Sequence, residues 1–114
     1  MKNVYIMSAN RSAIGGFGGT LKGFCPVDLG TLVAKEAISR SGYDPKEIDH
    51  AVFGNVIHTE PRDMYVSRVI ALQSGLRKDS AALTVNRLCG SGLQAIISAI
   101  QLLALEDASI TMAG

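Results

Sequence analysis

The stretch that decides the fold joins a short β-like run to a long apolar helix and reads Ala82-Leu83-Thr84-Val85-Asn86-Arg87-Leu88-Cys89-Gly90-Ser91-Gly92-Leu93-Gln94-Ala95-Ile96. Its turn holds Cys89 beside Gly90 and Gly92, which let the backbone turn tightly and let a substrate approach. The N-terminus of a helix carries partial positive charge and unpaired N–H groups, so a thiol there is shifted toward thiolate, the form that attacks carbonyls. The stretch therefore predicts a strand-to-helix unit with Cys89 as a candidate nucleophile.

The same alternation of strand and helix extends along the rest of the chain. Hydrophobic periodicity predicts strands at residues 4–7, 51–57 (ending near His58), 82–85 and 109–113, and helices at 26–41, 64–74 and 91–105. Pro26 suits the first turn of a helix, and Gly42 and Gly75 are expected to end the first two helices. The order β-α-β-α-β-α-β predicts an α/β fold with a mainly parallel sheet, right-handed crossovers and flanking helices.

Composition excludes several classes of protein. The 114 residues suffice for one small domain, and the hydrophobic content of 47% with few aromatics fits an α/β core. The net charge of +1 is scattered, so a nucleic-acid partner is not expected. No signal peptide is recognisable, and two cysteines make neither a disulfide framework nor a zinc site. We therefore expect no metal and a reducing, cytoplasmic setting.

Residues 88–105 carry no charge and approach the length of a membrane span. The helix expected at 91–105 would be only ~22 Å long, and polar residues dilute it, so a buried core helix is preferred to a membrane partner. Three helices are few for covering both faces of a parallel sheet, and the last strand ends the chain. The chain is therefore expected to be a truncated part of a larger domain.

A glycine-rich loop over residues 11–23 suggests phosphate binding, but its spacing does not fit. The dinucleotide pattern that starts at Gly16 needs a glycine where Leu21 stands, and the P-loop pattern that starts at Gly18 needs a lysine where Phe24 stands. A structural loop that permits close backbone packing is therefore favoured over a phosphate cradle.

For Cys89 the alternative is a buried cysteine that packs as a small hydrophobic residue. The order strand, cysteine, glycine, any residue, glycine, helix favours the nucleophile, because it parallels the strand-to-helix elbow of the serine hydrolases. In parallel sheets ligands collect at the carboxyl ends of the strands. Cys89 and His58 both follow predicted strands, so both are expected at that edge.

Other polar residues have simpler interpretations. Cys25 precedes a helix, but a capping or packing role is preferred to catalysis for it. His58 is the local candidate base, although a polar residue at a strand end is the simpler interpretation, and His50 is expected at the surface. A solvated turn and the acidic start of the second helix are expected from Glu60, Arg62 and Asp63.

The stretch around Cys89, residues 86–96, resembles the acylation-site signature of the thiolases, the acetyl-CoA acyltransferases. Residues 11–19 resemble the first loop of that family, and Leu29-Gly30 and Gly54-Asn55-Val56 also match, so the resemblance covers the whole chain in order. Residues 59–65 (TEPRDMY) depart from the commoner Gly-Gln-Asn version. They look more like bacterial β-ketothiolases of broad chain-length range, including those that feed polyhydroxyalkanoate synthesis.

The resemblance implies a fold and a chemistry. The family's catalytic domain has two duplicated β-α-β-α-β-α-β-β halves, and the helix at 91–105 would pack against the second half. The cysteine that matches Cys89 is acylated: its thiolate attacks the keto carbon of a 3-ketoacyl-CoA, acetyl-CoA leaves, and a second coenzyme A takes the acyl group. The backbone N–H of Cys89 contributes to an oxyanion hole. Coenzyme A and acyl-CoA are substrates, and no permanently bound cofactor is implied.

The family also needs a His in a Gly-His-Pro motif, an Asn in an Asn-Glu-Ala-Phe motif and a second Cys for proton transfer, and this chain lacks those motifs. We therefore expect residues 1–114 to be an N-terminal half-domain without the loop domain and the C-terminal half, and without turnover alone. Family members are dimers or tetramers, which implies a homodimer or homotetramer for the full-length enzyme.

Two alternatives remain open. A ketoacyl-synthase-type condensing enzyme shares the fold and the cysteine, and its other catalytic residues would also lie downstream. A non-catalytic half-domain would act only as an assembly module, through an unpartnered apolar face of the third helix formed by Leu93, Ile96, Ile97, Ile100 and Leu103. If these residues face solvent, association in solution is expected.

Overall fold

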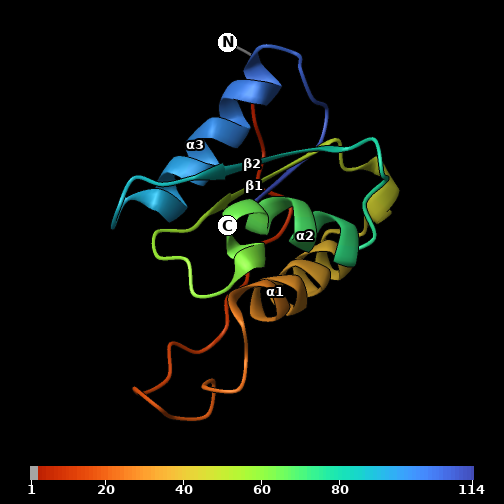
Figure 1. The fold of residues 1–114 in the computed structure, drawn as a ribbon. Helices are drawn as coiled ribbons and strands as arrows, with labels where there is room; N and C mark the ends of the chain where they lie inside the picture. The colour runs from red at the N-terminus through yellow and green to blue at the C-terminus, as the bar shows by residue number, and fades with distance from the viewer. Residues whose placement is uncertain (1–2) are drawn as a thin grey trace.

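A parallel three-stranded sheet forms the centre of the computed structural model, which describes residues 3–114 (Figure 1). Its strands are β1 (His50–Gly54), β2 (Ala81–Val85) and β3 (Thr111–Ala113), in the order β2-β1-β3. Both pairings are parallel, with His50 opposite Ala81 on one side and opposite Thr111 on the other. The prediction of an α/β fold with a parallel sheet is confirmed.

Helices cover both faces of the sheet. Helix α1 (Pro26–Ser41) and helix α2 (Val66–Gln73) lie on one face, and α3 (Ser91–Ala104) lies on the other (Figure 1). Two short 3₁₀ helices, η1 (Pro45–Glu47) and η2 (Pro61–Tyr65), precede β1 and α2. Among the described residues no helix is long and apolar enough to cross a membrane.

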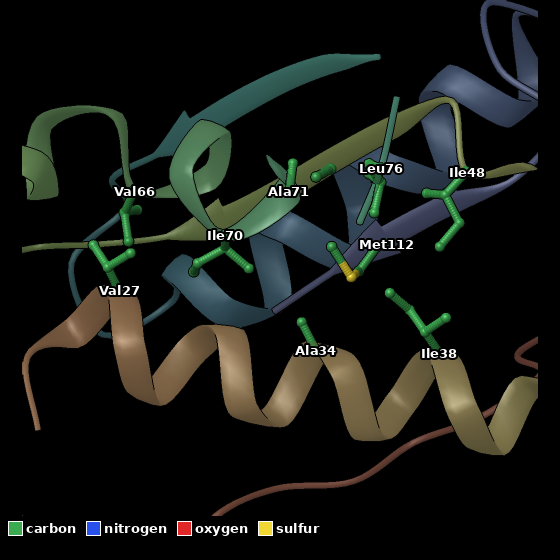
Figure 2. Close-up of a cluster of buried hydrophobic side chains, with 10 residues drawn as sticks. Val27, Ala34, Ile38, Ile48, Val66, Ile70, Ala71, Leu76 and Met112 are labelled. Carbon is green, nitrogen blue, oxygen red and sulfur yellow. The ribbon is translucent and has the colours of Figure 1, made fainter. Parts of the chain in front are cut away.

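The main hydrophobic core lies between α1, α2 and the sheet, and Figure 2 shows its side chains pointing toward one another. It consists of Val27, Ala34, Ile38, Ile48, Ala51, Val66, Ile70, Ala71, Leu76 and Met112. A smaller cluster of Val52, Ala95 and Ala99 lies on the face toward α3. Because successive strand residues point to opposite faces, Ala51 and Val52 of β1 serve one cluster each.

The ends of α1 and α2 confirm the expectations from proline and glycine. Pro26 stands in the first turn of α1, where its missing N–H leaves no acceptor unsatisfied. Gly42 caps the other end with φ +77°, and Gly75 has φ +95° just after α2. Both values lie in the left-handed region, which costs glycine little because it has no Cβ.

The strand predicted at residues 4–7 is not formed, and that prediction is wrong. This segment lies along α1: the Ser8 hydroxyl donates to the carbonyl of Ala37 (2.7 Å), and the Asn10 side-chain amide donates to the carbonyl of Val33 (3.0 Å). The large apolar side chains between Val4 and Ser8 stay exposed. The sheet of the described residues therefore has three strands, where the sequence pattern predicts four.

Three other predicted elements are shorter than expected. β1 ends at Gly54, four residues before His58. The Asn55 N–H still donates to the Val85 carbonyl of β2, and the Asn55 side-chain amide donates to the carbonyl of Asp63. α2 begins at Val66, because residues 61–65 form the 3₁₀ helix that Pro61 starts. The last strand begins at Thr111, because the N–H groups of Ser109 and Ile110 bind a carboxylate instead of a neighbouring strand.

That carboxylate belongs to Asp49, which joins the beginnings of all three strands. The Asp49 carboxylate accepts hydrogen bonds from the backbone N–H groups of Ser109 (2.7 Å) and Ile110 (3.2 Å). The backbone carbonyl of Asp49 accepts one from the Ala81 N–H (2.9 Å). The pKa of Asp49 is lowered, first by the hydrogen bond from the Ser109 N–H and then by Ile110 and the Arg77 guanidinium. Together these effects outweigh burial, which by itself would raise the pKa. Asp49 therefore stabilises the sheet in its charged form.

The variant Asp49→Asn should lower the free energy of unfolding by about 1–3 kcal/mol at neutral pH, because the hydrogen bonds at this carboxylate involve a charge. Since the pKa is lower in the folded chain than in the unfolded chain, the contribution is complete above the unfolded pKa and is lost as the pH falls through the folded pKa. Urea unfolding at neutral pH and in acid measures both effects.

Asp79→Asn is the matched control, because Asp79 contacts the same Arg77 but is exposed and binds no backbone N–H across the sheet. An equal loss of stability in both variants would show that the ion pairs with Arg77, and not the amides of residues 109–110, carry the effect.

Candidate functional site

Cys89 stands in the turn between β2 and α3, as the sequence predicts. Its side chain is exposed and its thiol is free. Gly90 is the N-cap residue of α3, and its carbonyl accepts the first helical hydrogen bond, from Gln94 N–H (2.9 Å). The alternative of a cysteine buried in the core does not fit this position.

The turn that carries Cys89 is held by hydrogen bonds inside it. Ser91 accepts a hydrogen bond from the Arg87 N–H at its Oγ (2.9 Å) and donates its hydroxyl to the Leu88 carbonyl (2.6 Å). The Gly90 N–H donates to the Arg87 carbonyl (3.0 Å). Leu88 has φ +48°, a left-handed conformation that costs a residue with a Cβ about 1–2 kcal/mol. These bonds offset that cost locally.

Asn86 ties this turn to the loop that follows β1. Its side-chain oxygen accepts from the Leu88 N–H (3.1 Å), and its side-chain amide donates to the Val56 carbonyl (3.3 Å). The Asn55 N–H donates to the Val85 carbonyl (3.0 Å). The loops after β1 and β2 therefore meet at one end of the sheet, the left end in Figure 1, as expected for the carboxyl edge of parallel strands.

Gly54 lets the first turn of α3 approach β1 closely. A Cβ built on Gly54 would lie 2.7 Å from the Cβ of Ser91 and 2.8 Å from its carbonyl carbon. These are distances that real Cβ atoms essentially never show, and one of the obstructing atoms is backbone. Gly54 therefore sets the position of the α3 N-terminus relative to the sheet.

Asp63 differs from the expectation of a solvated turn for residues 60–63. Asp63 is completely buried: its Oδ2 accepts from the Thr59 N–H (2.7 Å), the Thr59 hydroxyl (2.8 Å) and the Glu60 N–H (3.1 Å). Burial by itself would raise the pKa of Asp63, but these hydrogen bonds and nearby His58 lower it overall. The sequence signal for this role is the capping-box spacing between Glu60 and Asp63.

His58 itself is exposed in the loop after β1, and Arg62 bends back to pair with Glu60 (2.8 Å). In the described part of the chain no hydrogen bond joins His58 to Cys89, so the pairing of thiol and base is not formed here. His50 lies half-buried at the beginning of β1, at the opposite end of the sheet from Cys89. His50 is therefore partly exposed, which agrees with the expected place at the surface.

Cys25 also precedes a helix but has a different environment. It is the N-cap residue of α1 without a side-chain capping bond, and an Arg62 guanidinium N–H lies 3.3 Å from its sulfur. The pKa of the Cys25 thiol is nevertheless raised, first by a hydrogen bond with the Asp28 carboxylate and further by burial and Glu60. Nearby carboxylates therefore outweigh the helix N-terminus and Arg62, which fits the packing role expected of Cys25.

The surroundings of Cys89 are open. The two grooves beside residues 10–12 and α1 do not include it. Across residues 3–114 no three His, Cys, Asp or Glu side chains come together as a metal site would require. The arrangement presents an exposed thiol on a hydrogen-bonded turn at a helix N-terminus, a position suited to attack on a carbonyl carbon. Further protein segments would have to enclose the substrate, because neither groove of the described residues includes the thiol.

Comparison with known proteins adds independent information. The family described as "Thiolase, N-terminal domain" matches residues 4–114. The β-ketothiolase BktB of Cupriavidus necator is 51% identical over 113 residues, which are 99% of this chain and 29% of that protein. The mitochondrial 3-ketoacyl-CoA thiolase of Homo sapiens is 35% identical over all 114 residues, again 29% of its length.

Solved structures give the same result. The crystal structure of human mitochondrial 3-ketoacyl-CoA thiolase in complex with CoA superposes with a TM-score of 0.89 at 36% identity, covering 91% of this chain and 26% of that one. The acetyl-CoA acetyltransferase of Bacillus anthracis gives 0.89 at 38% identity, covering 96% and 27%. The chain thus spans less than a third of the length of the relatives it matches.

The close approach at Gly54 predicts the effect of a single methyl group. Gly54→Ala should lower the free energy of unfolding by about 1–3 kcal/mol, because the Cβ forces the first turn of α3 away from β1. Gly92→Ala is the matched control: no atom lies within 4 Å of its Cβ position, and alanine in a helix should raise stability by about 0.5–1 kcal/mol. Denaturant unfolding of both variants checks the opposite signs, and a neutral Gly54→Ala would contradict the packing.

Proposed function

Since the chain belongs to the thiolase family through the N-terminal domain of those enzymes, we propose that it provides the nucleophile Cys89 of an acetyl-CoA acyltransferase. The observation that carries this proposal is the exposed thiol at the beginning of α3, at the carboxyl edge of the sheet. The family match favours this function over the ketoacyl-synthase alternative.

In the proposed reaction the Cys89 thiolate attacks the keto carbon of a 3-ketoacyl-CoA. The tetrahedral alkoxide is stabilised by an oxyanion hole to which the Cys89 backbone N–H contributes. Its collapse breaks the carbon–carbon bond, the acetyl-CoA carbanion leaves and takes up a proton, and the acyl group stays on sulfur. The thiolate of a second coenzyme A then attacks the acyl-cysteine and releases acyl-CoA and Cys89, which is a ping-pong sequence.

The acyl-CoA substrates are proposed from the family. One solved relative is a complex with CoA, which supports coenzyme A as the carrier of the acyl group. No residue of this chain is assigned to that carrier, and no permanently bound cofactor is part of the proposal. Bacterial and mitochondrial relatives are both matched, and with both thiols free we propose the cytoplasm as the compartment.

The rest of a thiolase would complete the site. We propose that a C-terminal half covers the apolar face of α3, where Leu93, Ile96 and Ile97 are all more than a third exposed. The same half would supply the acid–base groups that the described residues do not bring to Cys89. A homodimer or homotetramer is proposed for such a complete enzyme. Residues 1–114 would then be its N-terminal half-domain, and the exposed face of α3 would serve assembly as well.

Acylation of Cys89 tests the nucleophile directly. On incubation with acetoacetyl-CoA or acetyl-CoA, the purified chain should gain one acetyl group, which peptide mass spectrometry should locate on Cys89. Cys89→Ser should abolish the adduct and Cys25→Ser should leave it, because the pKa of the Cys25 thiol is raised by its carboxylate neighbours. Acetylation confined to Cys25 would overturn the assignment.

Turnover is expected to need more than this chain. Residues 1–114 alone should form the acyl-cysteine slowly, with water as the proton source for the departing carbanion. They should not sustain cleavage of acetoacetyl-CoA, because no group that the described residues bring to Cys89 takes the proton from the second thiol. A coupled assay for acetyl-CoA formation over many equivalents of chain measures this. Continuous cleavage by the purified chain, abolished by Cys89→Ser, would contradict it while leaving the nucleophile assignment intact.

A further inference from the structure

We propose that Ser91 is a positioning residue for the Cys89 thiol: its buried hydroxyl holds the left-handed turn at Leu88, and this inference rests on the proposed role of Cys89. Ser91 is the first residue of α3 and is 5% exposed. The sequence resemblance includes this serine but assigns it no task.

The hydroxyl of Ser91 bonds backward into the turn. A serine at the beginning of a helix commonly accepts a hydrogen bond from an N–H further along the helix. Ser91 Oγ instead accepts from the Arg87 N–H (2.9 Å) and donates to the Leu88 carbonyl (2.6 Å). The Leu88 carbonyl also accepts from the Ser91 N–H (3.0 Å). One side chain therefore bonds the peptide group before Arg87 and the peptide group after Leu88, on either side of the Arg87–Leu88 peptide.

Leu88 needs such a restraint because leucine rarely adopts a positive φ. Its side chain is 68% exposed, so packing does little to hold it, and the turn depends on hydrogen bonds. Asn86 supplies one more, to the Leu88 N–H. Without the hydroxyl the residue is free to relax to a negative φ, which would redirect the next residue, Cys89.

The position of the hydroxyl is itself fixed relative to the sheet. The Cβ and backbone of Ser91 lie directly against Gly54, the last residue of β1. The chain of contacts therefore runs from the central strand to the serine, from the serine to the turn, and from the turn to the thiol. This arrangement sets where the thiol lies at the carboxyl edge. Catalysis by proximity and orientation requires such a fixed position of the reacting group.

The test compares Ser91→Ala with Ser91→Thr, which keeps the hydroxyl. It also includes Ser98→Ala as a matched serine of the same helix, whose hydroxyl accepts a hydrogen bond from the Gln94 side-chain amide. Acetylation of Cys89 by acetoacetyl-CoA is measured beside alkylation by iodoacetamide, all in a Cys25→Ser background. Ser91→Ala should slow acetylation up to about 100-fold, because it depends on the orientation of the thiol, and leave alkylation within about two-fold. Ser91→Thr should recover most of the rate, and Ser98→Ala should match the parent.

A second variant separates positioning from simple loss of stability. Leu88→Asn accepts a positive φ more readily than leucine, so it should restore part of the acetylation rate when it is added to Ser91→Ala. Backbone NOEs of Leu88, which report φ, should show the left-handed conformation in the parent and its loss in Ser91→Ala.

The outcomes are distinct. Equal acetylation rates and an unchanged Leu88 in Ser91→Ala would overturn the positioning role and leave the proposed function standing. A parent chain that is not acetylated at all would overturn the proposed function, and the NOEs of Leu88 would still decide whether Ser91 holds the turn. Equal losses of both acetylation and alkylation would show a structural role only.

Discussion

The absence of a side chain at Gly54 is the constraint on which the site depends. It lets the first turn of α3 lie against the end of β1, with Ser91 in direct contact. From there the turn of residues 86–90 is held by short hydrogen bonds, and Cys89 is presented at the carboxyl edge of the sheet. A side chain at position 54 would therefore change the direction in which the Cys89 thiol points, even with every residue of the stretch 86–96 unchanged.

Cys25 shows that a position at a helix N-terminus does not by itself lower the pKa of a thiol. Cys25 and Cys89 both precede a helix, and both are free. Cys25 has carboxylates on two sides, from Asp28 and Glu60, and the pKa of its thiol is raised even though Arg62 lies beside it. Local charge therefore outweighs the helix dipole in setting the pKa of the Cys25 thiol.

The parts of the fold that depend on short-range pattern were predictable from sequence. Pro26 and Gly42 mark α1 to the residue, and the strand-to-helix unit at Cys89 lies where its glycines indicate. Errors arose where a polar side chain takes a backbone partner from distant parts of the chain. Asp49 binds the amides that a longer β3 would have used. Ser8 and Asn10 bind carbonyls of α1, so the first segment lies along that helix.

The position of Cys89 between strand and helix was predictable from sequence, but the residues that support this turn were not, and the nucleophilic role of Cys89 stays a proposal. Cys89 could be found because glycines and a helix start surround it in sequence. The charge pattern predicts a solvated Asp63, because a sequence does not reveal a carboxylate that turns inward to accept three hydrogen bonds. The hydroxyl of Ser91 has the same difficulty: a serine at a helix start predicts a forward cap, and only the three-dimensional turn shows that it bonds backward.

The carboxylate of Asp49 has a consequence for the order of folding. Its bonds to Ser109 and Ile110 join residues 60 and 61 positions apart, so they close a loop that holds more than half the chain. Closing such a loop costs chain entropy before any contact compensates for it. The pairing of β1 with β2, which lies nearer in sequence, can form earlier. The hydrogen bonds of Asp49 to residues 109–110 would then form late in folding, and they would mainly set the rate of unfolding.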